Sequence, residues 1–400
     1  MTDQETPQYR SPLLDRPGAV AGTGPDAAVA LHYGNPVAEG RALGAGTGIV
    51  DLSHQEVVTV SGADRLTWLH SITSQNLLDL SPGDSRELLV LDTKGHIEYA
   101  AAVADDGITT WLLVDTGQGA GLAKWLTSMQ FAMRVEVTEA TEQWATIALV
   151  SPRQEPGLDV AITWVDPWPG VTEGGTSYYP ELEHPGAEHQ WQRLVIRREE
   201  LAGAVVVLEK QGFQLVGSWA GEAARIAALR PRFVTEVDER TIAHELDWLR
   251  TAVHLHKGCY RGQETIARVH NLGRPPRRLT FLDLDGSQAL LPEPGADVYA
   301  LPADTTGLSI ENLGRPVGHL TSSARHHELG HIGLALLKRS VPLDQVLVVP
   351  VGSELLTATQ TEVVVQSGEP VTRPEPRAQT SREVGRRPGG GLAGMPGAFG

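Results

Sequence analysis

Three short β-rich runs separated by two turn signals constrain the fold of this 400-residue chain more than any other feature. The runs are RELLVLD (86–92), HIEYAAAV (96–103) and ITTWLLVD (108–115), and they are rich in residues that favour strands. Lys94-Gly95 separates the first run from the second, and Asp105-Asp106-Gly107 separates the second from the third. Because such short turns join antiparallel neighbours, the sequence predicts an antiparallel meander.

Helical patterns flank the predicted meander. Leu66, Leu69 and Ile72 recur at helical spacing before it, and a second helical stretch follows near residues 122–129. Strands are predicted at RVEVTEA (134–140) and WATIALV (144–150), and a further helix at GEAARIAALR (221–230). Since strands and helices mix in this way, the fold class is predicted to be α+β.

After residue 278 the pattern changes to consecutive short strands. These are RLTFLDLD, ADVYALP, GRPVGHLTSS, HIGLALLKR, VLVVPV and TEVVVQ, and they predict a separate small antiparallel β-barrel. The ends of the chain are rich in Pro, Gly, Ser, Thr and charge and show no apolar periodicity. We therefore predict a mobile tail over residues 1–30, an α+β region of two subdomains over 31–277, a barrel over 278–367 and a disordered tail over 368–400. A Pro/Gly-rich stretch over about 151–190 interrupts the α+β region as a long insertion or interdomain connection.

Composition and charge exclude several classes of protein. The 33 basic and 49 acidic residues give a net charge of −16, which opposes a broad nucleic-acid surface or an anionic membrane as partner. No apolar run is long enough for a membrane span, and the polar, acidic start lacks the pattern of a signal peptide, so we expect a cytoplasmic protein. The single cysteine excludes an internal disulfide. Two groups of histidines, His254 with His256 and His326 with His327 and His331, lack carboxylates at ligand spacing, so no metal site is predicted.

The segment HKGCYRGQET (256–265) holds the densest set of reactive groups. It contains Lys257, the only thiol (Cys259), Tyr260, Gln263 and Glu264. Basic residues from Lys257 to Arg278 make it the start of a basic island in an acidic protein, and cations beside a thiol favour the reactive thiolate. A small buried cysteine in a plain glycine turn is the alternative interpretation, and a solvated charged face is the alternative for the island.

KGCYRGQE also resembles the K-G-C-Y-x-G-Q-E signature of the YgfZ branch of the folate-binding YgfZ/GcvT superfamily, with a complete match. GIVDLSH (48–54) and GADRLTWLHSITSQ (62–75) are similar to the amino-terminal strand and helix of that superfamily. GRPVGHLTSS (314–323) and LGHIGLALL (329–337) look like its barrel ending. The resemblance spans roughly residues 28–350.

The resemblance implies a three-domain ring or cloverleaf of the GcvT type, in which ferredoxin-like α+β modules and the barrel surround a channel for tetrahydrofolate or a one-carbon derivative. VDERTIAHE (237–245) looks like the segment with the acid that binds the pterin, which makes Glu245 the pterin candidate. An ordinary glutamate at the start of a helix is the alternative. The anionic glutamate tail would then lie on the basic island around Arg261, Arg268 and Arg274, together with Arg225 or Arg230.

One departure from the superfamily concerns catalysis. Its aminomethyltransferases carry a Gly-Gly-Ile-x-Asp-Asp run with an essential aspartate beside the folate, whereas this chain has Gly95-His96-Ile97-Glu98-Tyr99-Ala100. Tyr99 then takes the aspartate position beside the cofactor, and a phenol is not charged at neutral pH. We therefore expect no working aminomethyltransferase.

Three functions remain open at this stage. The resemblance favours a tetrahydrofolate-binding accessory protein for the assembly or repair of iron–sulfur enzymes, with effects on tRNA modification. Its partners would be a reduced folate and iron–sulfur assembly proteins or client enzymes, and Cys259 would be its reactive thiol. The alternatives are an aminomethyltransferase of the glycine cleavage type and a module that binds folate without any reaction.

Overall fold

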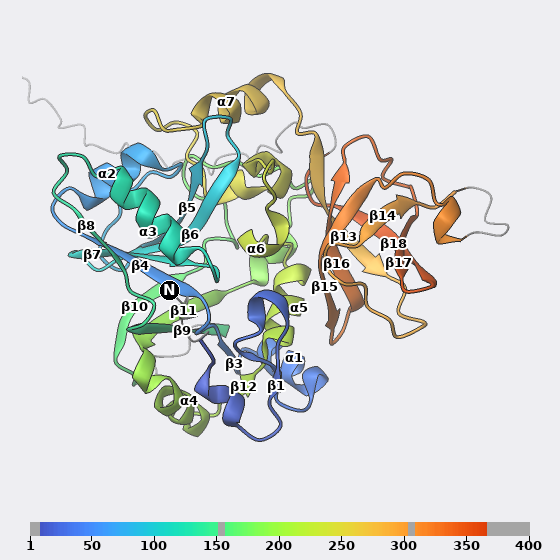
Figure 1. The fold of residues 1–400 in the computed structure, drawn as a ribbon, viewed down its shortest axis with the longest axis horizontal. Helices are drawn as coiled ribbons and strands as arrows, with labels where there is room; N and C mark the ends of the chain where they lie inside the picture. Colours follow the sequence, from blue (N-terminus) through green and yellow to red (C-terminus); the bar gives the residue numbers. More distant parts are fainter. Residues whose placement is uncertain (1–8, 151–156, 303–308, 366–400) are drawn as a thin grey trace, which may run out of the picture.

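The computed structural model describes residues 9–150, 157–302 and 309–365. These parts form two five-stranded sheets and a closed six-stranded barrel, which lies beside the sheets (Figure 1). The predicted disordered tail, residues 368–400, lies outside the described residues.

The predicted meander forms the first sheet, whose strand order is β5-β6-β7-β4-β8. Its strands, all paired antiparallel, are β4 (Glu56–Ser61), β5 (Ser85–Leu91), β6 (Ile97–Asp105), β7 (Thr109–Val114) and β8 (Glu136–Glu139). Helices α2 (Arg65–Ile72) and α3 (Gly119–Ser128) cover one face, where Val103 and Leu112 pack with Trp68 and Leu122. Because side chains alternate along a strand, Ala102 of β6 lies on the opposite face.

The second sheet has the strand order β10-β11-β9-β3-β12. Its strands are β3 (Gly48–Asp51), β9 (Trp144–Val150), β10 (Val160–Val165), β11 (Trp191–Arg197) and β12 (Gln214–Val216); only the β3–β12 pair is parallel. Helix α4 (Leu201–Lys210) packs on the face that carries Ile49. Helices α1 (Pro36–Gly44) and α5 (Ser218–Ala227) pack on the other face, which carries Val50.

The two sheets pack against each other through one apolar cluster. Ala102, Ala104 and Trp111 of the first sheet meet Trp164 and Val195 of the second. All five side chains are buried, so the sheets form one continuous body and fix the walls of the space at their edge.

The predicted insertion is a tightly packed connection. Apart from β10 and the 3-10 turn η3 (Pro185–Glu188), its described residues have no helix or strand, yet Trp168 and Tyr178 are fully buried. The Trp168 indole donates to the carbonyl of Ala228 at 2.9 Å. The amide of Thr172 donates at 3.0 Å to the carbonyl of Arg250, next to the short turns η5 (Ala243–Leu246) and η6 (Trp248–Arg250).

The barrel closes in the order β13-β16-β15-β14-β17-β18, with β13 paired to both β16 and β18. Its strands are β13 (Arg277–Leu284), β14 (Asp297–Ala300), β15 (Gly318–His326), β16 (Gly330–Lys338), β17 (Leu347–Val351) and β18 (Glu354–Glu362). Leu282, Leu320 and Leu347 are among the side chains that fill it. The predicted α+β region followed by an antiparallel barrel is confirmed.

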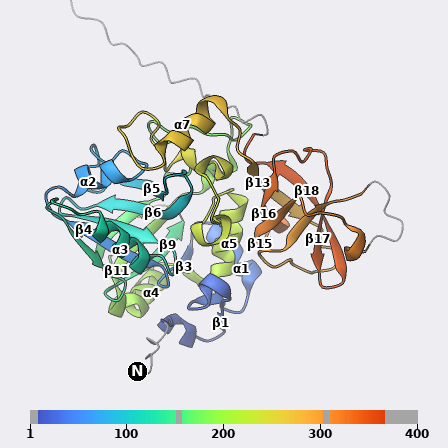
Figure 2. The ribbon, with the colours of Figure 1, turned by 45° about the horizontal axis from the view of Figure 1, so that its top comes forward.

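The N-terminal segment differs from the predicted mobile tail. Residues 9–32 form the 3-10 turns η1 (Pro12–Asp15) and η2 (Gly24–Asp26) and the strands β1 (Val20–Ala21) and β2 (Ala30–His32). Turn η1 packs beside α4, and β2 packs beside α5 (Figure 2). Individual side chains fix this segment to the rest of the protein. Leu13 is buried under α4, and the Ser11 hydroxyl donates to Asp51 at 2.5 Å. A few isolated anchors leave no periodic pattern in a sequence, which is why the segment resembled a tail.

Candidate functional site

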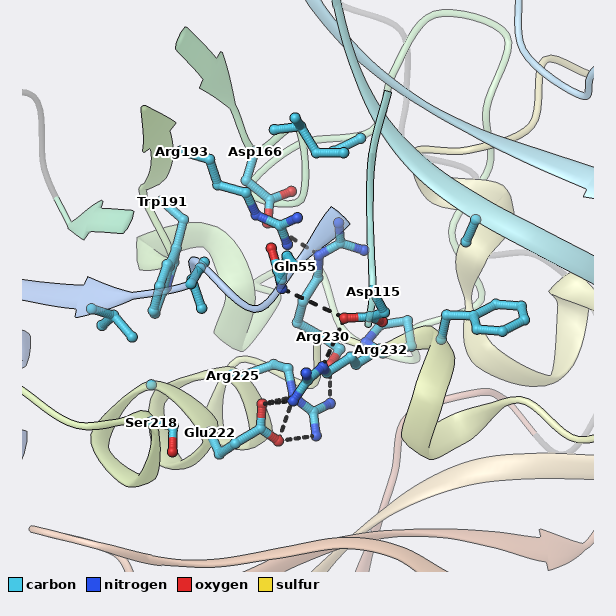
Figure 3. A pocket seen from close by; sticks show the side chains of 18 of the residues that line it. Gln55, Asp115, Asp166, Trp191, Arg193, Ser218, Glu222, Arg225, Arg230 and Arg232 are labelled. Carbon is cyan, nitrogen blue, oxygen red and sulfur yellow. Dashed lines mark hydrogen bonds and ion pairs between the residues drawn. The ribbon is translucent and has the colours of Figure 1, made fainter. Parts of the chain in front are cut away.

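A pocket opens where the two sheets meet helix α5 and the residues that follow it (Figure 3). Its empty space, counted together with the open solvent at its mouth, is about 840 Å³. Ala100 and Ala102 of β6 form one wall, and Trp191 and Arg193 of β11 form another. Residues 230–233, which follow α5, complete the lining with two arginines and Phe233.

Three of the four arginines that line the pocket are neutralised by carboxylates. The ion pairs, with their N–O distances, are Arg225 with Glu222 (2.8 Å) and Glu236 (3.0 Å), Arg230 with Glu87 (2.7 Å) and Asp166 (3.1 Å), and Arg232 with Asp26 (2.8 Å), Asp115 (3.0 Å) and Glu222 (3.2 Å). Although burial raises the pKa of Asp26, Arg232 and His54 outweigh it and hold that pKa well below its ordinary value. Every carboxylate that lines the described pocket forms an ion pair with an arginine.

Arg193 lies in the same lining without such a pair. Within residues 9–150, 157–302 and 309–365, no hydrogen bond or ion pair involves its guanidinium, which packs over the ring of Trp164 at 4.8 Å. Burial lowers the pKa of Arg193, although Asp166 and Asp115 oppose the shift from a distance. The guanidinium remains a cation at neutral pH because its ordinary pKa is above 12.

Other buried polar atoms of the lining also lack a hydrogen-bond partner among the described residues. They are Gln55 Oε1, Ser218 Oγ, Arg230 Nη1 and Trp248 Nε1. A buried polar atom without a partner costs free energy, so a set of them around one space indicates groups that a ligand satisfies. Two of the four are N–H donors, one is an acceptor, and the hydroxyl can act either way.

His189 adds a neutral ring to the lining. Burial and the charges of Arg230, Arg225 and Arg193 hold its pKa well below the ordinary value, so the imidazole is uncharged at neutral pH. Its centroid is 5.2 Å from that of Trp191, with the two planes tilted by 34°. The two rings give the pocket a flat aromatic side.

Two of the predicted cofactor residues lie on β6 and α5, with different outcomes. Arg225 lines the pocket, but carboxylates already neutralise it. Tyr99 points to the other face of the sheet, where it packs with the α2 and α3 cluster. The residue of this run that faces the pocket is Ala100, because side chains alternate along β6.

Glu245, the predicted pterin acid, lies outside the pocket lining. Its fully buried carboxylate accepts from Arg277 Nε at 2.9 Å and Nη2 at 2.8 Å, and from the amides of Arg277 and Ile242, each at 3.2 Å. It thereby joins turn η5 to the first barrel strand. The ion pair accounts for a glutamate at this position without any ligand.

Lys257 anchors the KGCYRGQE loop to helix α2. Its ammonium donates to the carbonyls of His70, Thr73 (2.6 Å) and Gln75 (3.0 Å), at and just beyond the end of that helix. Burial lowers the pKa of Lys257 to about 8. The Tyr260 ring lies 5.0 Å from the same ammonium, so the lysine is enclosed between helix and loop.

The remainder of the loop starts helix α7 (Gln263–Leu272). Gln263 Oε1 accepts from the amide of Tyr260 at 3.0 Å and closes the turn. Gly262 has φ +82°, and a Cβ there would lie 2.6 Å from the carbonyl oxygen of Asp92, so only glycine fits. Gly258 meets neither condition, because a Cβ there would contact nothing within 4 Å.

The remaining predicted residues lie at the surface of this loop and helix. Cys259, Glu264 and Arg268 are exposed, so the thiol is accessible to a partner or a reagent. Arg261 pairs with Glu98 at 2.8 Å. Among the described residues, none from 257 to 268 lines the pocket. The two regions are nevertheless joined, since Ala100 and Trp248 of the pocket share one apolar cluster with Tyr260 and Ile266.

Sequence reasoning missed most of the lining. Arg193, Arg232, Asp26 and Asp115 lie in four segments far apart in the chain, and no motif marks them. One signal was present. Trp191 and Arg193 are two residues apart on a strand and therefore share one face, which places a cation on an otherwise apolar face.

Two searches of the described residues were negative. No helix there is both long and apolar enough to cross a membrane. No group of three or more His, Cys, Asp or Glu side chains in that part of the chain is arranged to hold a metal ion.

Comparison with known proteins finds similar sequences among transferases and among iron–sulfur cluster assembly factors. A putative chloroplastic transferase of Arabidopsis thaliana is 28% identical over 308 residues, which span 74% of this chain and 66% of that protein. An iron–sulfur cluster assembly factor IBA57 homolog, mitochondrial, of Phaeosphaeria nodorum is 23% identical and matches 72% of this chain and 70% of that protein. An aminomethyltransferase of Herpetosiphon aurantiacus is 23% identical, with 75% and 85% matched. Since two of these names specify organelles, the cytoplasmic location stays a prediction.

The fold agrees with these relatives. Aminomethyltransferase T of the glycine cleavage system from Bartonella henselae superposes with a TM-score of 0.67 at 16% identity, over 88% of this chain and 95% of that one. The model of the GCVT N-terminal domain family matches residues 15–163. The chain therefore has a GcvT-like fold, and its residues 15–163 are similar to the GCVT N-terminal domain.

Proposed function

We propose that the chain binds a reduced folate in the pocket and acts, like a protein of the YgfZ branch, as an accessory factor in the assembly or repair of iron–sulfur enzymes. The complete KGCYRGQE signature and the similarity to an iron–sulfur assembly factor homolog support this proposal. Its partners would be iron–sulfur assembly proteins or client enzymes, and an effect on tRNA modification would follow from the needs of such enzymes.

The lining of the pocket is the observation that carries the proposal. A pterin is flat and presents adjacent donors and acceptors along its edge. Trp191 and His189 offer it a flat side, and Gln55 Oε1, Arg230 Nη1 and Trp248 Nε1 offer a mixed set of unpaired hydrogen-bonding groups. The ligand would restore the hydrogen bonds that these buried atoms lack.

The same lining argues against aminomethyl transfer. The face of β6 toward the pocket carries the methyl groups of Ala100 and Ala102, in the run where the superfamily's transferases have an aspartate. The carboxylates that line the described pocket are ion-paired with arginines, so their oxygens are already engaged. A general base with a pKa near neutral is what proton transfer to or from a bound amine requires.

The exposed thiol of Cys259 would contact the iron–sulfur assembly protein or client enzyme. It lies on a loop that packs on the same apolar cluster as the pocket wall, so a ligand in the pocket and a partner at the thiol contact one packed unit. Folate binding and partner binding would therefore influence each other.

Anaerobic calorimetry with tetrahydrofolate tests the first half of the proposal, since saturable binding by the full chain is expected. A deletion strain tests the second half: iron–sulfur enzymes should lose activity, a dehydratase without a cluster should not, and the wild-type gene should restore the loss. If the purified protein turned over an aminomethyl-lipoyl donor repeatedly to methylene-tetrahydrofolate, the aminomethyltransferase alternative would replace the proposal.

A further inference from the structure

The four arginines of the pocket differ in what they can offer a ligand. Arg225, Arg230 and Arg232 each contact at least two carboxylates, so an anion that approached them would compete with partners already in place. Arg193 has no such partner in the described part of the chain. Its five donors are therefore available.

The position of Arg193 is fixed by its surroundings. It lies on β11 opposite Ala148 of β9, with two residues on either side of it in the same strand ladder. Its guanidinium packs on the ring of Trp164, whose indole donates to the carbonyl of Arg86 at 2.8 Å. A guanidinium held in this way loses little entropy when it binds.

Among the residues that the structure describes, the charge of Arg193 also lacks a counter-ion at contact distance. Asp166 and Asp115 stabilise it only from further away, because Arg230 and Arg232 take their oxygens. Arg193 is half-buried, so its unpaired charge is only partly solvated, and an anion delivered by a ligand would compensate for the lost solvation. A planar guanidinium matches a carboxylate with two parallel hydrogen bonds.

We propose that Arg193 binds a carboxylate of the pocket's ligand and is the residue that selects an acid-bearing pterin over a plain one. The inference rests on the proposed function, because in a folate the carboxylates belong to the glutamate. The proposal places the glutamate carboxylates at Arg193 of β11, inside the pocket, whereas the family resemblance places them at the basic island around Arg261 and Arg268.

The test combines three probes with two variants. Anaerobic titrations compare tetrahydrofolate, tetrahydropterin (which has no carboxylate) and p-aminobenzoyl-glutamate (which has no pterin) against wild type, Arg193→Gln and Arg197→Gln. Arg197 is a matched control, since it lies on the same strand and stacks on Trp144 at 4.1 Å, outside the pocket lining. Urea unfolding of each variant shows whether it is folded.

Arg193→Gln should weaken tetrahydrofolate binding by about ten- to a hundredfold, the usual loss for a hydrogen-bonded charge. It should leave tetrahydropterin binding unchanged within twofold, and Arg197→Gln should change neither. An equal loss for both ligands, or no loss for tetrahydrofolate, would overturn the assignment of Arg193. If wild type bound p-aminobenzoyl-glutamate through Arg193 but neither pterin, the proposed function would fail and the assignment would stand; binding of none of the probes overturns both.

Discussion

The Glu245→Gln variant tests whether Glu245, the predicted pterin-binding acid, stabilises the fold or binds the ligand. Its carboxylate is fully buried, and Arg277 binds it with two side-chain nitrogens. Removing one partner of a buried ion pair costs about 3–5 kcal/mol. Because the Arg277 side chain is one-fifth exposed and keeps Asp238 as a second partner, we expect a loss at the lower end, about 3 kcal/mol.

Urea unfolding followed by tryptophan fluorescence measures this loss. Asp238→Asn is the matched control, since Asp238 contacts the same arginine but is 42% exposed, and its loss should stay below about 1 kcal/mol. Tetrahydrofolate affinity should be unchanged in both variants. The reasoning fails if Glu245→Gln unfolds at the wild-type urea concentration while its folate affinity falls tenfold, because Glu245 would then be a ligand group.

Three further outcomes follow from the loop and the core. Gly262→Ala should destabilise the protein by at least about 2 kcal/mol, because the methyl group would collide with the Asp92 carbonyl, whereas Gly258→Ala should stay within about 0.5 kcal/mol; both are read by urea unfolding. Burial lowers the pKa of His244 to about 3, so below pH 6.5 the unfolded chain takes up a proton that the folded chain does not. Stability should therefore fall by about 2 kcal/mol between pH 7 and pH 5 through this residue, and His244→Phe should lose that much less. Cys259→Ala should leave stability and folate affinity unchanged because the thiol is exposed, yet fail to rescue the deletion strain; full rescue would limit Cys259 to a structural role.

The fold could be predicted largely because its signals are local. Hairpin turns at Lys94-Gly95 and around Asp106 stand between runs that pair with each other, so neighbouring sequence segments are also neighbours in space. Part of the barrel follows the same logic, because β14 pairs with β15, β15 with β16 and β17 with β18, whereas β13 pairs with the distant strands β16 and β18. The N-terminal segment was not found in this way, because its contacts are made by single residues such as Leu13 with segments far along the chain.

The candidate site was harder to predict, because its residues meet only through the tertiary fold. The KGCYRGQE motif correctly marked a shaped loop. The sequence could not show that the Lys257 ammonium donates hydrogen bonds to three carbonyls at and just beyond the end of helix α2, far away in the chain. It also could not show that Arg277 forms an ion pair with Glu245, or that Arg193 has no ion-pair partner in the described part of the chain. Whether a charge is neutralised depends on its ion-pair partner, and the partners here lie up to 206 residues apart in the chain.

The ion pair between Asp26 and Arg232 has a consequence for the order in which the protein matures during synthesis. Asp26 leaves the ribosome 206 residues before its partner. At about 5–20 residues per second, the early carboxylate waits roughly 10–40 s for the arginine. Strand β3 likewise waits for β12, its parallel neighbour. The pocket therefore cannot be complete on a nascent chain until its last lining residue, Trp248, has been translated.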